Sequence, residues 1–170
     1  MRKDNRGITL VEIMVVIAIM AIVAGVGITG LNLVNGRPAQ QCAQKIIYSL
    51  ERHRTTAMSK VDASYTLEVQ SSGKTVCVER VSNDRVSYTT TESEIGAKRV
   101  KLFYETADGS VVPMTAGMFI TFQYDRSSGA FRSITASTGD EVARVIAKSG
   151  GREVKVRFVK ITGKVYWDLD

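Results

Sequence analysis

Hydrophobic residues follow three patterns along the chain, and each pattern predicts a different kind of element. The first is a run of 19 residues without a charged side chain, from Ile13 to Leu31. As a helix with a rise of about 1.5 Å per residue, this run is roughly 28 Å long, close to the hydrocarbon thickness of a bilayer. It therefore predicts an apolar helix that anchors the chain in a membrane. The run is longer than the apolar region of an ordinary secretory signal, and no small-residue cleavage site follows it.

The second pattern, over residues 37–62, is amphipathic. Lys, Arg, Gln and Glu separate apolar residues that recur at intervals of three and four. These apolar residues are Ala39, Ala43, Ile46, Ile47, Leu50, Ala57, Met58 and Val61. The spacing predicts a helix that packs one apolar stripe on a globular domain. Asn35-Gly36 and Pro38 predict a break or kink just before this stretch.

The third pattern, from Ser64 onward, is the alternation that is typical of strands. The expected strands are SYTLEVQ, TVCVER, RVKLFYE, MFITFQYD, AFRSITA, EVARVIA, EVKVRFV and KVYWD. Residues 71–74 and 126–129 predict hairpin turns, as do the glycines before the last two strands. Residues 82–97 are rich in Ser, Thr, Glu and Asn, and we expect a long surface loop there. The chain as a whole thus predicts an α+β fold with a helix followed by an antiparallel β-rich head.

Charge and candidate chemistry do not indicate an enzyme. The formal net charge is +6, and five of these charges belong to the chain from Arg37 onward, where they are scattered. Such a surface is compatible with an acidic partner, including DNA, although mild basicity is ordinary. The single histidine, His53, lies between two arginines, which predicts a neutral surface residue. No nucleophile elbow, P-loop or zinc spacing is present, and Asp125, Asp140 and Glu141 lack the spacing of a calcium loop. We therefore expect no catalytic residue, no cofactor and no metal.

The two cysteines, Cys42 and Cys77, leave two interpretations open. If the head is exported, a disulfide between them is allowed by the compartment and would stabilise the domain by about 2–4 kcal/mol. Cys42 also fits a buried position of the amphipathic helix, and packing alone would account for it.

One carboxylate, Glu12, lies at the start of the apolar run. A carboxylate in this position is retained at little cost if it meets a positive partner among apolar side chains. A new α-amino group, made by cutting the chain after Gly7, would supply that partner, either on the same helix or on a neighbouring helix displaced along its axis. A buried charge pair is better at fixing register than at adding stability. The alternative is a stray interfacial acid on a monomeric anchor.

The segment RGITLVEIMVVIAIMAIVA resembles the N-terminal signature of type IV pilins and type II secretion pseudopilins. The matching positions are Gly7, Ile8, Thr9, Leu10, Val11 and Glu12. The resemblance implies a prepilin peptidase that cuts between Gly7 and Ile8 and methylates the new amine of Ile8. Ile8 departs from the phenylalanine that is usual at this position. The implied pilin-like fold is a long helix packed on antiparallel sheets.

Positive charge before the span predicts the orientation of the chain in the membrane. The basic leader is expected to stay in the cytoplasm, which places the head outside a bacterial inner (cytoplasmic) membrane. The implied regions are a cleaved leader (1–7), a transmembrane and filament-core stretch (8–36), an amphipathic stretch (37–62) and the head (63–170). Ala21 and Gly25, four residues apart, form a small-xxx-small pair that permits close approach of helices.

Three further segments resemble the GspH/FimT-type minor pilins more loosely: SLERHRTTAMSKVDASYTLEV, ITFQYDRSSGAF and VRFVKITGKVYW. The implied partners are other pilins or pseudopilins, an assembly platform protein and its motor ATPase. Some relatives of this type capture DNA, for which Arg126, Arg132, Arg152 and Lys164 are the candidate contacts here. A monomeric membrane-anchored exodomain is the remaining alternative. The sequence does not separate a pilus subunit from a secretion or competence pseudopilin.

Overall fold

A computed structural model describes residues 10–169 of the chain, with the side chains of residues 24–35 and 169 left out. The chain divides into two compact units, residues 1–34 and residues 35–170.

The helix of the described residues, α1 (Leu10–Ser59), contains Pro38 in its interior. The break expected at residues 35–38 is therefore wrong, because α1 continues through these positions. Pro38 removes one N–H from the helical ladder, but the helix continues on both sides of it. Gly36 has a different role, since a Cβ there would lie 2.9 Å from the Cβ and Cδ of Arg152. The glycine allows Arg152 of the head to approach the helix backbone.

Ten strands follow the helix in the described part of the chain. They are β1 (Asp62–Val69), β2 (Thr75–Ser82), β3 (Tyr88–Gly96), β4 (Lys101–Thr106), β5 (Val111–Pro113), β6 (Phe119–Tyr124), β7 (Phe131–Ala136), β8 (Val142–Ser149), β9 (Arg152–Val159) and β10 (Lys164–Leu169). All eight expected strands are confirmed. The loop expected over residues 82–97 is wrong, because most of it forms β3, and the short strand β5 was not expected.

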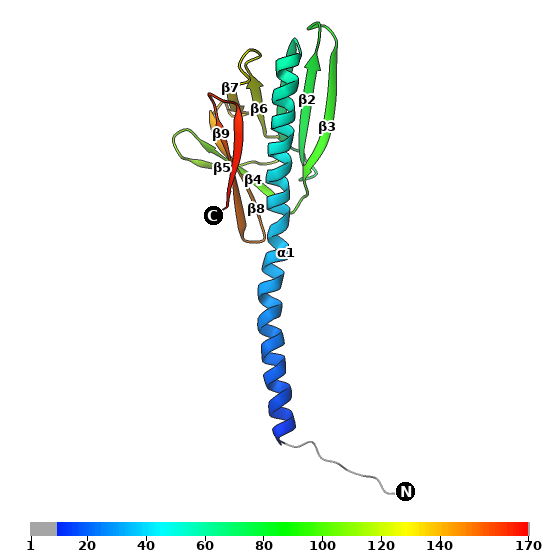
Figure 1. Cartoon of the computed structure of the whole chain (residues 1–170), viewed down its shortest axis with the longest axis vertical. Coiled ribbons are helices and arrows are strands. Elements are labelled where there is room, and N and C mark those ends of the chain that lie inside the picture. Colours follow the sequence, from blue (N-terminus) through cyan, green and yellow to red (C-terminus); the bar gives the residue numbers. More distant parts are fainter. Residues whose placement is uncertain (1–9, 170) are drawn as a thin grey trace, which may run out of the picture. The chain divides into compact units, whose positions relative to one another are not determined.

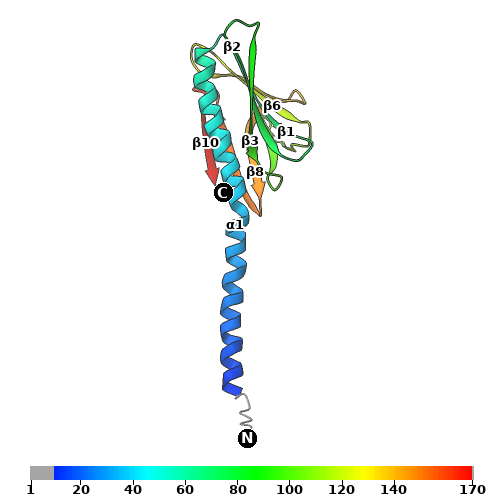
Figure 2. The ribbon, with the colours of Figure 1, turned by 90° about the vertical axis from the view of Figure 1, so that its right-hand side faces the viewer.

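The strands form two five-stranded sheets, with the orders β3-β2-β1-β6-β7 and β10-β9-β8-β4-β5. We call them sheet A and sheet B. All of their pairings are antiparallel, so the α+β, pilin-like fold class is confirmed. Within the head, residues 39–57 of α1 run between edge strand β3 of sheet A and edge strand β10 of sheet B (Figures 1 and 2).

The core of the head lies between this helical stretch and the inner faces of the two sheets. The helix buries a stripe at intervals of four and three residues: Ala39, Ala43, Ile46, Leu50, His53 and Ala57. Five of these six positions belong to the predicted apolar stripe. On β9, Val154, Val156 and Phe158 are buried while Arg157 is exposed, as the alternation predicts. The two sheets meet through aromatic edge contacts, in which the ring centroids of Phe122 and Phe158 are 5.2 Å apart.

Two hairpin turns, one from each sheet, are joined through the helix. Arg54 donates from Nε to the carbonyl oxygen of Gly129, at 2.9 Å. Gly163 has a φ of +66°, and a Cβ on it would overlap that same carbonyl oxygen. The expected turns at Arg126–Gly129 and at Thr162-Gly163 thus exist, and tertiary packing places them against one another.

Candidate functional site

The first stretch of α1, residues 10–23, presents large apolar side chains in every direction. Eleven of them are exposed: Leu10, Val11, Ile13, Met14, Val15, Val16, Ile17, Ile19, Met20, Ile22 and Val23. A helix that is apolar all round is stable only where other apolar groups surround it, as in a membrane or a bundle of helices. We call this segment the stem.

Glu12 is the acidic residue of the first turn of α1, and it is exposed. A carboxylate at that end of a helix interacts favourably with the helix dipole. The predicted cleavage and methylation positions, Gly7 and Ile8, lie outside the described residues. Ala21 is exposed on the stem, whereas the surroundings of Gly25 are not described. The stem residues that are described thus combine one acid with an otherwise apolar surface.

Within the part of the chain that the structure describes, no helix combines the length and the apolar character needed to cross a bilayer. The predicted span, Ile13–Leu31, includes positions 24–31, whose side chains lie outside the described residues.

His53 is a buried residue, so its prediction as a surface histidine is wrong. Its side chain is 0% exposed, and it continues the spacing of the apolar stripe of α1. Its ring lies against Tyr65 of β1 and Tyr124 of β6, with centroid distances of 5.3 and 5.8 Å. The three-and-four spacing from Leu50 and Ala57 is the sequence signal that identifies this position as buried.

The hydrogen bonding of His53 indicates its tautomer. Nδ1 lies 3.0 Å from Oε1 of Glu79, a carboxylate that can only accept, so Nδ1 carries the proton. Nε2 is buried without a hydrogen-bond partner among the described residues. Protonating Nε2 would bury an unpartnered charged donor. Accordingly, burial lowers the pKa of His53, although the hydrogen bond and the charge of Glu79 act in the opposite direction.

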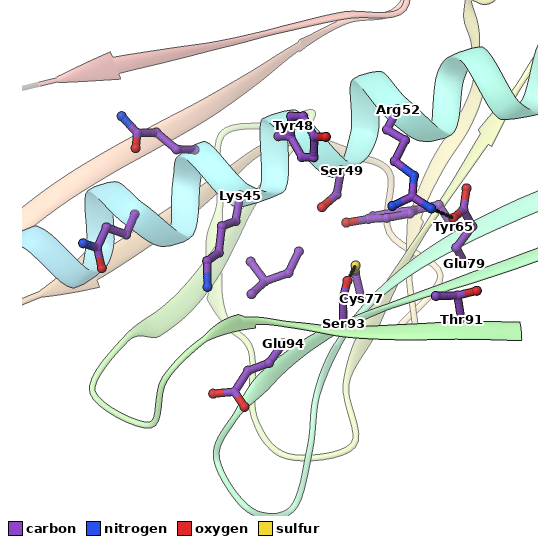
Figure 3. Close-up of a pocket in the computed structure, with 13 residues that line it drawn as sticks. Lys45, Tyr48, Ser49, Arg52, Tyr65, Cys77, Glu79, Thr91, Ser93 and Glu94 are labelled. Carbon is purple, nitrogen blue, oxygen red and sulfur yellow. Dashed lines mark hydrogen bonds and ion pairs between the residues drawn. The ribbon is translucent and has the colours of Figure 1, made fainter.

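A cavity of about 710 Å³ opens beside this histidine, between α1 and strands β2 and β3 (Figure 3). The helix contributes Lys45, Tyr48, Ser49 and Arg52 to its lining, among others. Arg52 also lies 3.6 Å from Glu79, which closes the gap between the helix and β2 at that point. No local pattern in the sequence predicts this cavity, because part of its strand side is built by β3, in the segment that was expected to be a loop.

Tyr65 forms part of the cavity floor. The residue is 1% exposed, and its hydroxyl has no hydrogen-bond partner among the described residues. Burial is the largest cause that raises the pKa of this hydroxyl above its usual range, with the neighbouring Cys77 thiol adding to it. The hydroxyl is therefore a neutral donor at physiological pH, held at the inner end of the cavity.

Both cysteines are buried, and neither forms a disulfide in the structure. Cys42 packs in the helix stripe, where burial raises the pKa of its thiol to about 12. The Sγ of Cys77 lies 2.9 Å from Oγ of Ser93 on β3. Of the two interpretations left open by the sequence, the structure therefore presents the one in which Cys42 is held by packing, with no disulfide to Cys77.

The candidate DNA contacts do not form a single cluster. Arg126, Arg132 and Lys164 are exposed, and their strands meet at the end of the head where residues 129 and 163 are in contact. Arg152 is half-buried and starts β9, whose last residue, Val159, pairs with Lys164. At about 3.3 Å per residue, the length of β9 separates Arg152 from the other end by roughly 23 Å.

The acidic residues considered for calcium act as acceptors within turns. Asp125 accepts hydrogen bonds from Ser127 and Ser128, which hold the pKa of its carboxyl below the usual range. Asp140 accepts from the hydroxyls of Tyr104 and Thr138. In the described part of the chain, no three metal-ligating side chains lie together.

Comparison with known proteins identifies the N-terminal segment. Residues 2–28 match the family described as the prokaryotic N-terminal methylation motif. No curated protein and no solved structure matches the chain. The matched segment contains Gly7, Ile8 and Glu12 and overlaps the stem, the surface that is apolar all round. The motif thus indicates that the chain is a type IV pilin-like precursor, of the kind that a prepilin peptidase processes.

Proposed function

We propose that the chain is a non-enzymatic filament subunit, a minor pilin or pseudopilin most similar to the GspH/FimT type. The observation that carries this proposal is the overlap of the methylation motif, residues 2–28, with a stem whose described side chains are apolar on all sides. Such a stem needs an apolar environment both before and after assembly. A bilayer supplies the first environment, and the stems of partner subunits supply the second.

In this mechanism the peptidase cuts after Gly7 and methylates the amine of Ile8. The new positive amine pairs with the Glu12 carboxylate of a neighbouring subunit. Burial of the apolar stem drives lateral packing, while the charge pair selects the axial position at which neighbours stop. The close approach of helices at Ala21 and Gly25 contributes to this packing.

The proposed location is the bacterial inner membrane, with one span and the head outside, followed by a periplasmic or extracellular filament. The basic leader residues before the stem support this orientation. The proposed partners are the prepilin peptidase, other pilins or pseudopilins, and a platform protein with its motor ATPase, which supplies the work of extraction from the bilayer.

The proposal is tested by mass spectrometry of the mature chain and by recovery of filaments. We expect a mature N-terminus at methylated Ile8, and an uncleaved precursor from Gly7→Leu. Glu12→Gln should be cleaved normally but enter sheared filaments at least tenfold less, since it lacks the charge that fixes register. Asn5→Ala serves as a control that leaves both steps intact. Normal incorporation of Glu12→Gln would favour a monomeric membrane-anchored exodomain instead.

DNA capture is a second candidate function, favoured by three exposed cations, Arg126, Arg132 and Lys164, at one end of the head. Within the described residues none of them forms an ion pair, so all three are available to phosphates. Replacing the three with Gln should abolish DNA binding at low salt, whereas Arg152→Gln, at the opposite end of β9, should not. Equal binding by both proteins and the unmodified chain would exclude this surface.

A further inference from the structure

Strand β3 forms one edge of sheet A, and its outer side has no partner strand in the described structure. Seven of its nine residues, Tyr88 to Glu94, are exposed. The strand pairs with β2 in regular register over Tyr88–Glu94, and this register shifts only near Ile95. An edge of this length presents a row of unpaired backbone N–H and C=O groups.

The register shows that the helix covers sheet A only as far as β2. One row across the sheet joins Tyr65, Glu79 and Thr91. Along this row exposure increases from the buried tyrosine, through the half-buried glutamate, to the exposed threonine. The inner face of β3 therefore projects beyond the cover that α1 provides.

The neighbouring row repeats this gradient. It joins Leu67, Cys77 and Ser93, of which the first two are buried and the third is exposed. Side chains in the two rows change from apolar or aromatic to hydroxyl-bearing in the same direction. The cavity of about 710 Å³ lies along this transition and reaches from the Tyr65 floor to β3 (Figure 3). We call it the β3 groove.

The other wall of the β3 groove belongs to α1. Tyr48 stands at its rim with 69% of its surface exposed, and Lys45 and Arg52 flank it. The volume is in the range of sites that hold a ligand or several side chains of a partner. At the inner end, the buried Tyr65 hydroxyl makes no hydrogen bond of regular geometry among the described residues, and Ser49 and Cys77 are the polar groups close enough to act on it.

Over residues 88–94 the edge carries only part of the usual protection against an added strand. Charged side chains, proline and bulges are the common devices that block edge pairing; here the irregular register lies beyond Glu94, and residues 88–94 contain neither lysine nor proline. The only charges in this stretch are Glu92 and Glu94. Glu94 forms an ion pair with Lys74, at 2.8 Å, and Glu92 accepts a hydrogen bond from Gln70, at 2.7 Å. Lys74 and Gln70 both belong to the turn between β1 and β2, so neither covers the outer edge of β3.

We propose that the β3 edge and the β3 groove bind an extended, basic segment of a partner protein as a sixth strand of sheet A. Lys or Arg at alternate positions of that segment faces Glu92 and Glu94. The intervening side chains enter the β3 groove, where a long side chain ending in an amide oxygen can approach the Tyr65 hydroxyl. A second copy of β3 is disfavoured as the occupant, because like charges would then lie opposite one another. This site belongs to the head and does not depend on assembly through the stem.

The test uses the full chain in a neutral detergent and a fluorescent seven-residue peptide, acetyl-KVKQKVK-amide. We expect saturable binding by fluorescence anisotropy and slower amide hydrogen exchange in residues 88–94. The double variant Glu92→Gln/Glu94→Gln should bind about tenfold more weakly. Glu51→Gln, an exposed charge removal on α1 away from the β3 groove, should bind within about twofold of the unmodified chain.

Two N-methylated peptides test the backbone pairing itself. Methyl groups on the lysine amides block one edge of the peptide strand, and methyl groups on the intervening amides block the other. Strand addition requires that one of these peptides loses binding and the other keeps it. The proposal is overturned if neither methylation matters, or if no binding occurs at about 1 mM peptide. It is equally overturned if the slower hydrogen exchange of residues 88–94 is produced by maltohexaose, or by a higher concentration of the chain without the peptide.

Discussion

Two stretches of α1, residues 10–23 and residues 39–57, are both rich in apolar residues but use them differently. In the stem, apolar side chains point in all directions and stay exposed. In the second stretch, they are confined to a stripe that the head buries, and Lys, Arg and Glu occupy the other faces. The angular distribution of apolar residues, more than their number, thus decides whether a helix packs within its own chain or needs an external apolar environment.

The largest expected effect breaks the stripe of the second stretch. Leu50→Ala removes a fully buried side chain and leaves a cavity against the sheets, so it should lower the free energy of unfolding by about 2–5 kcal/mol. Denaturant unfolding of the full chain, followed by the fluorescence of the single Trp167, measures this change. Tyr48→Ala, at an exposed position of the same helical turn, should cost less than about 1 kcal/mol. Equal losses in the two variants would contradict the division of the helix into a buried and an exposed face.

The next largest effect is expected at the contact between the Gly129 and Gly163 turns, which Arg54 of α1 joins. Gly163→Ala combines a left-handed φ with overlap of the Gly129 carbonyl, and should destabilise the head by about 2–4 kcal/mol. Gly73→Ala is the matched control, because its φ is also positive but its nearest neighbour would be 3.8 Å away. It should cost only about 1 kcal/mol of backbone strain. A similar loss for both, by denaturant unfolding, would show that the contact with Gly129 contributes nothing.

A smaller effect comes from the polar residue within the stripe, and it depends on pH. The unfolded chain protonates His53 near its ordinary pKa of about 6.5, whereas the folded chain resists protonation to a lower pH. The contribution of His53 to stability is therefore full above about pH 7 and declines as the pH falls through 6.5 towards the lowered pKa, by at most about 1.4 kcal/mol per unit. Glu79, Arg52, Tyr65 and Tyr124 are the polar or charged groups around it.

Unfolding of the unmodified chain and of His53→Gln between pH 5.5 and pH 7.5 tests this assignment. The chain has no other histidine, so the slope in this window should be much smaller in the variant. The same slope in both proteins would assign the pH dependence to other groups.

The smallest effect on the head is expected from the stem. Ile17→Ala should change the free energy of unfolding of the head by less than about 0.5 kcal/mol, since the Ile17 side chain is largely exposed. Under the proposed assembly it should nevertheless reduce the recovery of the chain in sheared filaments, because the stem would bury this side chain against partner helices there. Loss of head stability without loss of incorporation into filaments would show that Ile17 packs within its own chain and not against partner helices.

Local patterns predicted most of the fold and the N-terminal site. Eight strands, the alternation along β9 and five of the six stripe positions followed from spacing alone, because the same local environment repeats along each element. Strand β3 could not be found this way. Its Thr, Ser and Glu residues are exposed for most of its length, so no alternation marks it, and pairing with β2 stabilises it. Pro38 predicted a break that does not occur, because the surrounding helix outweighs its lost hydrogen bond.

By itself, the sequence determined the apolar stem with its single acid, the processing motif, the helix stripe and the order of the hairpins. Each is a property of neighbouring residues and a fixed repeat. Only the tertiary structure decided that His53 is buried against Glu79, that the Gly129 and Gly163 turns touch, and that β3 is left with a free edge beside a groove. These features join residues far apart in the chain, and their energies depend on burial and partners that no local window contains.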